Sequence, residues 1–139
     1  MGMYPEYMVA PIREDLTSSG FEQLMTPEEV EQALKTEGTV LLAVNSVCGC
    51  AASKARPALK MAVAAADKAP TKLVTVFAGM EQEAVAKARE YMLPYPPSSP
   101  SIALFKDGEL VHMIERYHIE GNELHRIVDN LKGAFEAYC

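Results

Sequence analysis

The stretch Asn45-Ser46-Val47-Cys48-Gly49-Cys50-Ala51-Ala52 joins an apolar run to an Ala-rich one. The run before it, Val40-Leu41-Leu42-Ala43-Val44, is bounded upstream by Gly38 and is typical of a fully buried strand. The run after it, at about 50–66, is dense in Ala, Leu, Met and Lys, which are good helix formers. The sequence therefore predicts a strand, a turn and a helix, with two of the three cysteines at the turn.

Cys48 falls at or just before the first turn of this helix. Backbone N–H groups without partners and the positive end of the helix dipole favour a thiolate there, and the thiolate is the reactive form of cysteine. We therefore predict that Cys48 is a nucleophile with a lowered pKa. Asn45 and Ser46 border the turn and are candidates for hydrogen bonding to that thiolate, although small polar residues are common at any such turn.

The Cys-Gly-Cys spacing points to exchange chemistry. A disulfide between residues two apart closes a small ring in which the usual geometry is hard to reach, and strain makes it easier to reduce. Gly49, which lacks a Cβ and tolerates unusual dihedral angles, is expected to help Cys48 and Cys50 pair.

Two alternatives to catalysis exist for these cysteines. Buried cysteines often serve only as small hydrophobic residues. A metal site would use Cys48, Cys50, Cys139 and one of His112, His118 and His125. Zinc sites usually have a cysteine pair spaced by two to four residues and a second matching pair, and neither is present, so we predict no metal.

The composition bounds the class of protein. At 139 residues the chain predicts one domain, 1–139, with a substantial core. Lys and Arg number 13 against 19 Asp and Glu, so the net charge is −6 and nucleic acid is an unfavourable partner. No apolar run suits a membrane span and the N-terminus lacks a signal-peptide pattern, which predicts no membrane association and a cytoplasmic location.

Three cysteines, an odd number, indicate thiol chemistry in a reducing compartment rather than a disulfide framework. Cys139 is the last residue of the chain. Three roles stay open for Cys139: an unused exposed thiol, a site of intermolecular disulfides or a third redox participant. A homodimer also stays open for the chain.

Upstream of the cysteines, two helices are predicted. The first spans about 7–19, with Pro11 expected in its first turn and Gly20 at its end. The second begins at Thr26-Pro27-Glu28-Glu29, where Thr26 is the N-cap and Glu29 closes a capping box.

Downstream, Pro57 is expected to bend the cysteine-bearing helix or to delay its start. A second strand at 72–78 and a helix at about 81–92 follow, and this order implies parallel pairing of the two strands. A proline-rich loop at 93–100 leads to a hairpin that turns at Asp107-Gly108, and a last helix begins near Asn122.

The last seven of these elements resemble the thioredoxin fold. The resemblance implies an α/β protein with a central mixed four-stranded sheet flanked by helices, to which this chain adds an N-terminal helix. It also implies a cis peptide bond before Pro100. In that fold the backbone of the preceding residue, here Ser99, offers strand-like hydrogen bonds to an extended substrate.

Three segments resemble the bacilliredoxin family, whose members carry Cys-Gly-Cys in place of Cys-x-x-Cys. They are the stretch 45–52 with Ala55-Arg56-Pro57-Ala58 behind it, Met8-Val9-Ala10-Pro11-Ile12-Arg13-Glu14, and Pro96-Pro97-Ser98-Ser99-Pro100-Ser101. The family implies removal of bacillithiol, a small thiol co-substrate, from modified client proteins without a bound cofactor. Cys48 would take the bacillithiol and Cys50 or a second small thiol would resolve the mixed disulfide. Ser46, Arg56, Ser99 and Pro100 are the expected substrate-binding residues.

Departures from thioredoxins bear on mechanism. Ala51 stands where thioredoxins carry their second cysteine, and Leu42 stands where they carry a buried acid. A cycle that stops at a mixed disulfide with Cys48 therefore needs less machinery than full reduction. Disulfide isomerisation with weak reductase activity is one alternative function. A non-catalytic module that senses oxidation or holds a metal is the other.

Overall fold

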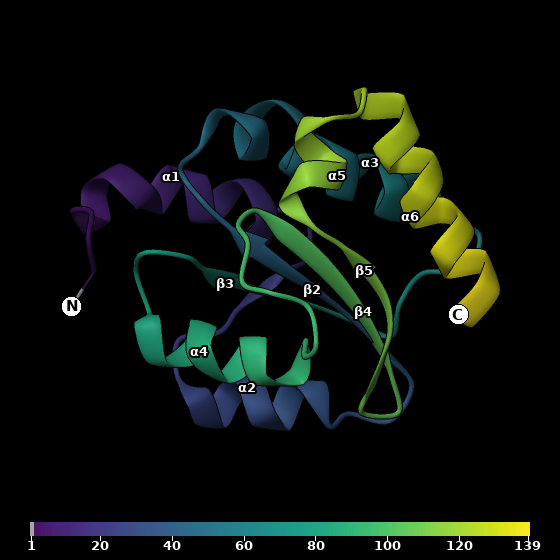
Figure 1. The fold of residues 1–139 in the computed structure, drawn as a ribbon, viewed down its shortest axis with the longest axis horizontal. Coiled ribbons are helices and arrows are strands. Elements are labelled where there is room, and N and C mark those ends of the chain that lie inside the picture. Colours follow the sequence, from purple (N-terminus) through teal and green to yellow (C-terminus); the bar gives the residue numbers. More distant parts are fainter. Residues whose placement is uncertain (1) are drawn as a thin grey trace.

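A computed structural model describes residues 2–139 of the chain. A five-stranded mixed sheet separates two groups of helices (Figure 1). Its strands, in the order β1-β3-β2-β4-β5, are β1 (Glu22–Gln23), β3 (Lys72–Phe77), β2 (Thr39–Asn45), β4 (Ser101–Lys106) and β5 (Glu109–Ile114). β3 pairs in parallel with β1 and β2, whereas β4 pairs antiparallel with β2 and β5. The predicted parallel pairing of the two central strands is confirmed.

The helices cover both faces of the sheet. They are α1 (Glu6–Thr17), α2 (Pro27–Leu34), α3 (Arg56–Ala65), α4 (Gln82–Tyr91), α5 (Arg116–Glu120) and α6 (Leu124–Tyr138), with a π-helical turn η1 (Ala51–Ala55) before α3. α2 packs beside α4 under one face, and α3 packs beside α6 over the other (Figure 1). Within residues 2–139, none of these helices combines the length and the apolar character that crossing a bilayer requires.

The predicted fold class is confirmed, but the sheet has five strands where four were predicted. β1 has two residues and α5 has five, so neither is long enough to show a hydrophobic period. β1 forms because β3 supplies a partner for it, with Glu22 opposite Val74.

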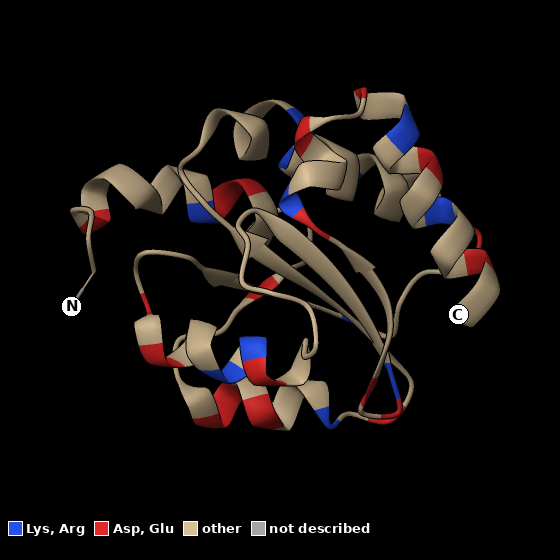
Figure 2. Ribbon diagram, viewed as in Figure 1, with Lys and Arg blue, Asp and Glu red and all other residues tan. Residues whose placement is uncertain are grey.

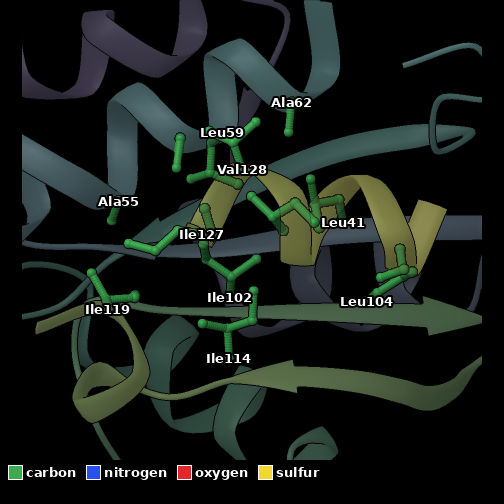
Figure 3. Packing of buried hydrophobic residues seen from close by; sticks show 14 of the residues in the cluster. Leu41, Ala55, Leu59, Ala62, Ile102, Leu104, Ile114, Ile119, Ile127 and Val128 are labelled. Atoms are coloured by element: carbon green, nitrogen blue, oxygen red, sulfur yellow. The ribbon is translucent and has the colours of Figure 1, made fainter. Parts of the chain in front are cut away.

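The central strand β2 explains why its sequence is continuously apolar. Every residue of β2 is buried, and its side chains alternate between two cores. Leu41 lies in the core beneath α3 and α6, together with Ile102 and Val128 (Figure 3). Leu42 lies in the core beneath α2 and α4. Burial of one such leucine contributes roughly 2–3 kcal/mol, so this strand is a major source of stability.

Local turn and cap signals match the structure. The backbone N–H of Glu29 donates to Thr26 Oγ1 at 3.1 Å, and the backbone N–H of Thr26 donates to Glu29 Oε1 at 3.2 Å, which completes the capping box. Asp107 and Gly108 have φ of 50° and 85°, and they form the two-residue hairpin turn between β4 and β5.

The expectation that Pro11 lies in a first helical turn is wrong. α1 begins at Glu6, so Pro11 lies inside the helix and removes one internal hydrogen bond. Tertiary contacts offset this loss. Val9 and Leu16 are fully buried beneath the helix, and Arg13 donates from Nη1 to Glu81 Oε1 at 2.8 Å.

Candidate functional site

The cysteine turn connects the end of β2 to the first helical residues at 49–50. The backbone N–H groups of Ala51 and Ala52 donate to the carbonyl of Cys48 at 3.1 and 3.2 Å. Cys48 is therefore the residue that caps the helix, as predicted. Both thiols are free and partly exposed, and the Sγ atoms of Cys48 and Cys50 lie 2.8 Å apart.

The regular α-helix α3 begins at Arg56, with Pro57 in its first turn. The turn before it, at Ala51–Ala55, is π-helical, and the N–H of Arg56 donates to the carbonyl of Ala51, five residues back. Pro57 has no N–H to donate to the preceding turn, and the wider turn lies directly before it. The predicted downstream start therefore holds for the regular α-helix, and a π turn fills the segment between it and the cysteines.

A buried polar network holds the turn from behind. Asn45 donates from Nδ2 to the carbonyl of Ile12 at 3.3 Å, while its Oδ1 accepts the N–H of Ser46 at 2.9 Å. Arg56 donates from Nη1 to Asn45 Oδ1 at 2.9 Å and to the carbonyl of Ser46 at 3.0 Å. Its Nε donates to Asp15 Oδ2 at 3.0 Å. The network ties the end of β2 to both α1 and α3.

Two predicted residues consequently have a different setting from the one expected. The amide of Asn45 is bonded to the backbone of α1 and to Ser46 and Arg56, not to a thiol. Arg56 is only 7% exposed and lies on the inner side of the turn. Its contacts support the turn rather than present a charge to an incoming substrate.

Asp15 completes the charge balance of this network. Its Oδ1 accepts a hydrogen bond from Lys60 Nζ at 2.6 Å, and its Oδ2 accepts from Arg56. The bond from Lys60, opposed by burial and aided by the bond from Arg56, holds the pKa of Asp15 below its ordinary value. The carboxylate is thus charged at neutral pH and compensates the buried guanidinium.

The two thiols have opposite pKa shifts. Burial acts to raise the pKa of Cys48, but hydrogen bonds from Cys50, Ser46 and the backbone N–H groups of Ala51 and Cys50 outweigh it, so that its pKa is lowered. The pKa of Cys50 is raised by burial, by its hydrogen bond to Cys48 and by the charge of the Cys48 thiolate. The predicted lowering of the Cys48 pKa agrees with this environment. Cys48 is therefore the thiol of the pair that ionises first, and Cys50 can then donate a hydrogen bond to it.

A shallow groove of about 260 Å³ lies beside Cys48. It is lined by residues from the N-terminal segment, the cysteine turn, the end of β3, the proline loop and α5: Met3, Tyr4, Ser46, Val47, Cys48, Ala78, Gly79, Ser99 and Arg116. The Ser99–Pro100 peptide is cis, as predicted, and Pro100 is buried directly before β4. The groove therefore brings Ser99 together with Ser46 and Cys48. Ser46 and Ser99 are more than fifty positions apart in the sequence.

Arg116 is a site residue that the sequence analysis did not identify. It donates from Nη1 to the carbonyl of Ser99 at 3.2 Å and from its backbone N–H to Ser98 Oγ at 3.3 Å. Its charge acts to lower the pKa of Cys50. The observed register, in which Ile102 pairs with Ile114, extends to place Arg116 beside Pro100. The predicted turn at Asp107-Gly108 would alone place Glu115 there, and the β-bulge between Leu104 and Phe105 shifts the register by one residue, so the sequence held no signal for Arg116.

The remaining candidates from the sequence, which are the metal ligands, Cys139 and Leu42, do not line the groove beside Cys48, apart from Cys48 itself. Among residues 2–139, no three His, Cys, Asp or Glu side chains gather where they could hold a metal ion. Cys139 is half-buried and packs against the core beneath α3 and α6, at the opposite end of α6 from α5 (Figure 1). Leu42 is fully buried among apolar residues, so its position offers no proton-transferring group.

Comparison with known proteins identifies relatives along nearly the whole chain. The family model described as disulphide isomerase matches residues 4–139. A bacilliredoxin of Cytophaga hutchinsonii is 54% identical over 134 residues, which cover 96% of this chain and 98% of the relative. A bacilliredoxin of Halalkalibacterium halodurans is 55% identical over 140 aligned positions, covering 98% of this chain and 96% of the relative.

Solved structures resemble the chain in fold. A mutant thioredoxin from Halobacterium salinarum superposes with a TM-score of 0.60 at 21% identity, over 86% of this chain and 91% of that one. Mitochondrial thioredoxin 3 from Saccharomyces cerevisiae gives a TM-score of 0.57 at 19% identity, over 84% of this chain and 98% of that one. The chain therefore has the thioredoxin fold.

Proposed function

This chain belongs to the bacilliredoxin family of thioredoxin-fold thiol–disulfide oxidoreductases, and on that premise we propose that it removes bacillithiol from protein mixed disulfides through Cys48. The observation that carries the proposal is the pair of free thiols 2.8 Å apart, of which Cys48 has the lowered pKa and Cys50 the raised one. In such a pair the thiol with the lowered pKa is the nucleophile, and the other thiol is available to resolve the mixed disulfide.

In the first step the Cys48 thiolate attacks the bacillithiol sulfur of the mixed disulfide. A new S–S bond forms between Cys48 and bacillithiol, the old S–S bond breaks, and the client cysteine leaves as a thiolate that takes up a proton. The step exchanges one disulfide for another, so it needs no external oxidant or reductant. Lowering the pKa of Cys48 increases the fraction of the protein that is ready to attack.

In the second step Cys50 attacks the Cys48 sulfur and releases bacillithiol, or a second small thiol does so. The charge and the hydrogen-bonding demand of the Cys48 thiolate help to raise the pKa of Cys50, after the larger effect of burial. Once Cys48 is bonded to bacillithiol, both of these contributions disappear, while the lowering effect of Arg116 persists. Formation of the mixed disulfide therefore brings the pKa of Cys50 down and prepares it to resolve.

The groove beside Cys48 supports binding of a small thiol together with a short client segment. The backbone N–H of Cys48 donates to Ser46 Oγ, and Ser99, which precedes cis-Pro100, lines the groove. In the proposed reaction the Ser99 backbone pairs with an extended client strand. Arg56 acts by positioning the turn. The proposed partners are bacillithiolated client proteins and free bacillithiol, and a reductive cycle of this kind suits the cytoplasm. No resident cofactor enters the scheme.

Disulfide isomerisation is the second candidate, because the matching family model carries that description. The same Cys48 thiolate would attack a protein disulfide, and Cys50 would release clients that fail to rearrange. Isomerisation and thiol removal share the first chemical step and differ in the disulfide that is attacked.

Intact-mass measurement tests the proposal. The reduced protein and its Cys48→Ser, Cys50→Ser and Cys139→Ser variants are incubated with a single-cysteine client protein that carries bacillithiol. We expect the mass of bacillithiol to accumulate on Cys50→Ser, to appear on Cys139→Ser as on wild type, and to be absent from Cys48→Ser. Transfer to Cys48→Ser would overturn the assignment of the nucleophile. Failure of all four proteins, with turnover of scrambled protein disulfides, would favour isomerisation instead.

A further inference from the structure

Charge is distributed unevenly around the groove beside Cys48. The chain as a whole has a net charge of −6, and its acidic residues are prominent on α2, α4 and α6 (Figure 2). Among the described residues that line the groove, by contrast, Arg116 is the only Lys, Arg, Asp or Glu. A group attached to the sulfur that Cys48 attacks therefore meets one cation and no carboxylate within the groove.

Contacts on two sides restrain the guanidinium of Arg116. Its Nε donates to Glu120 Oε2 at 3.0 Å, one helical turn along α5, and its Nη1 donates to the carbonyl of Ser99 at 3.2 Å. Among residues 2–139, no acceptor is bonded to Nη2. Because the side chain is 46% exposed, this free edge is open to a ligand. An arginine restrained in this way loses less conformational entropy when it binds an anion.

The guanidinium lies close enough to the reactive sulfurs to interact with them electrostatically. The hydrogen bond to Glu120 is the main cause that raises the pKa of Arg116, and the negative charge that Cys48 or Cys50 carries when ionised raises it further. Because Cys48 and Arg116 line the same groove, a small thiol bonded to Cys48 has its substituents in the groove that Arg116 lines. The groove volume of about 260 Å³ is near the lower limit of about 300 Å³ for small-molecule pockets, which suits a small thiol.

We propose that Arg116 is a specificity residue that selects small thiols carrying a carboxylate, by pairing with that carboxylate while the thiol is transferred to Cys48. The proposal rests on the proposed function, since it concerns the thiol removed in that reaction. A guanidinium matches a carboxylate in geometry as well as charge. Glu120 partly neutralises Arg116 from its far side, so the preference is modest. We expect a carboxylate to gain up to about fivefold in rate, which is the upper end of the range for one exposed ion pair.

The test uses one client protein with a single cysteine, charged in turn with 3-mercaptopropionate, 2-mercaptoethanol or cysteamine. These thiols are of similar size and carry a negative, a neutral and a positive end. Transfer to Cys50→Ser protein, in which the mixed disulfide accumulates, is followed by intact mass. Each rate is divided by the rate at which free dithiothreitol attacks the same client, which removes differences in intrinsic reactivity.

Three further variants in this background isolate the contribution of Arg116. Arg116→Gln should bring the ratio of anionic to cationic transfer rates close to one, and Arg116→Lys should retain most of it. Lys54→Gln is the matched control: it removes a cation that donates to the carbonyl of Glu120 but does not line the groove, so the ratio should stay at its original value. Glu120→Gln should increase the ratio, and salt should reduce it.

The outcomes separate the two proposals. If no thiol of any charge transfers to Cys48, the proposed function fails. If all three transfer at equal normalised rates, or if Arg116→Gln and Lys54→Gln reduce the ratio equally, transfer stands and the specificity of Arg116 is refuted. A melting curve for each variant verifies that it is folded.

Discussion

Replacing Arg56 by methionine should destabilise the protein and slow Cys48 together. Methionine retains an apolar stem in the buried space but cannot donate hydrogen bonds. The substitution removes the bonds to Asn45 Oδ1, to the carbonyl of Ser46 and to Asp15. These are the bonds that tie the turn to α1 and α3.

The expected loss of stability in Arg56→Met is the sum of the effects of these bonds. The carbonyl of Ser46 loses the bond from Arg56 in a buried position, which costs about 1–3 kcal/mol. Asn45 Oδ1 retains the N–H of Ser46, so only about 1 kcal/mol is lost there. Asp15 is 35% exposed and retains Lys60, so its contribution is small. We expect a decrease of about 2–4 kcal/mol in the free energy of unfolding, or roughly 6–16 °C in Tm.

Urea denaturation measures the stability change, and the rate of iodoacetamide alkylation at neutral pH measures the thiolate of Cys48. Alkylation should slow, because a displaced turn weakens the hydrogen bonds that lower the pKa of Cys48. Arg126→Met, on an exposed site of α6, is the control and should change stability by less than about 0.5 kcal/mol. Arg56→Lys should be intermediate in stability and in alkylation rate, because one ammonium group cannot reproduce the several N–H donors of the planar guanidinium.

A decrease of less than about 0.5 kcal/mol for Arg56→Met would refute the reasoning on the buried network. If the free energy of unfolding decreases as expected but the alkylation rate of Cys48 is unchanged, the network supports the fold without positioning the thiolate.

Three other perturbations have outcomes that follow from the site. Cys50→Ala should shift the alkylation profile of Cys48 to higher pH, because it removes the Cys50 hydrogen bond, which is the largest cause that lowers the Cys48 pKa; an unshifted profile would contradict this. Asp15→Asn should reduce the free energy of unfolding at pH 7, and this loss should shrink as the pH falls through the lowered Asp15 pKa. The reason is that a carboxylate with a depressed pKa stabilises the fold only when it is ionised. Urea denaturation at several pH values, starting above the ordinary pKa of 3.8, measures the loss. Gly49→Ala should leave the reduced protein as stable as before or more stable by about 0.5–1 kcal/mol, because a Cβ there meets nothing within 4 Å and the residue is helical; a marked loss in Tm would contradict the open setting of Gly49.

The sequence alone determined the elements whose signals are local. The strand before Cys48, the capping box of Thr26 and the turn at Asp107-Gly108 each depend on residues within a few positions of one another. The capped position of Cys48, which follows from the junction of strand and helix, was predictable for the same reason. The cis peptide before Pro100 was predictable only through resemblance to a family, because most X–Pro bonds are trans.

Tertiary structure alone decided the partners of these residues. Strand β1 exists because β3 accepts it, although they are about fifty positions apart. Arg56 supports the turn instead of facing substrate because Asp15 and Asn45 reach it from two other elements. Arg116 enters the site because the hairpin folds its end back against the proline loop. Local propensity acts through neighbouring residues, whereas the charge that faces a thiol is set by whichever chain segments the sheet brings together.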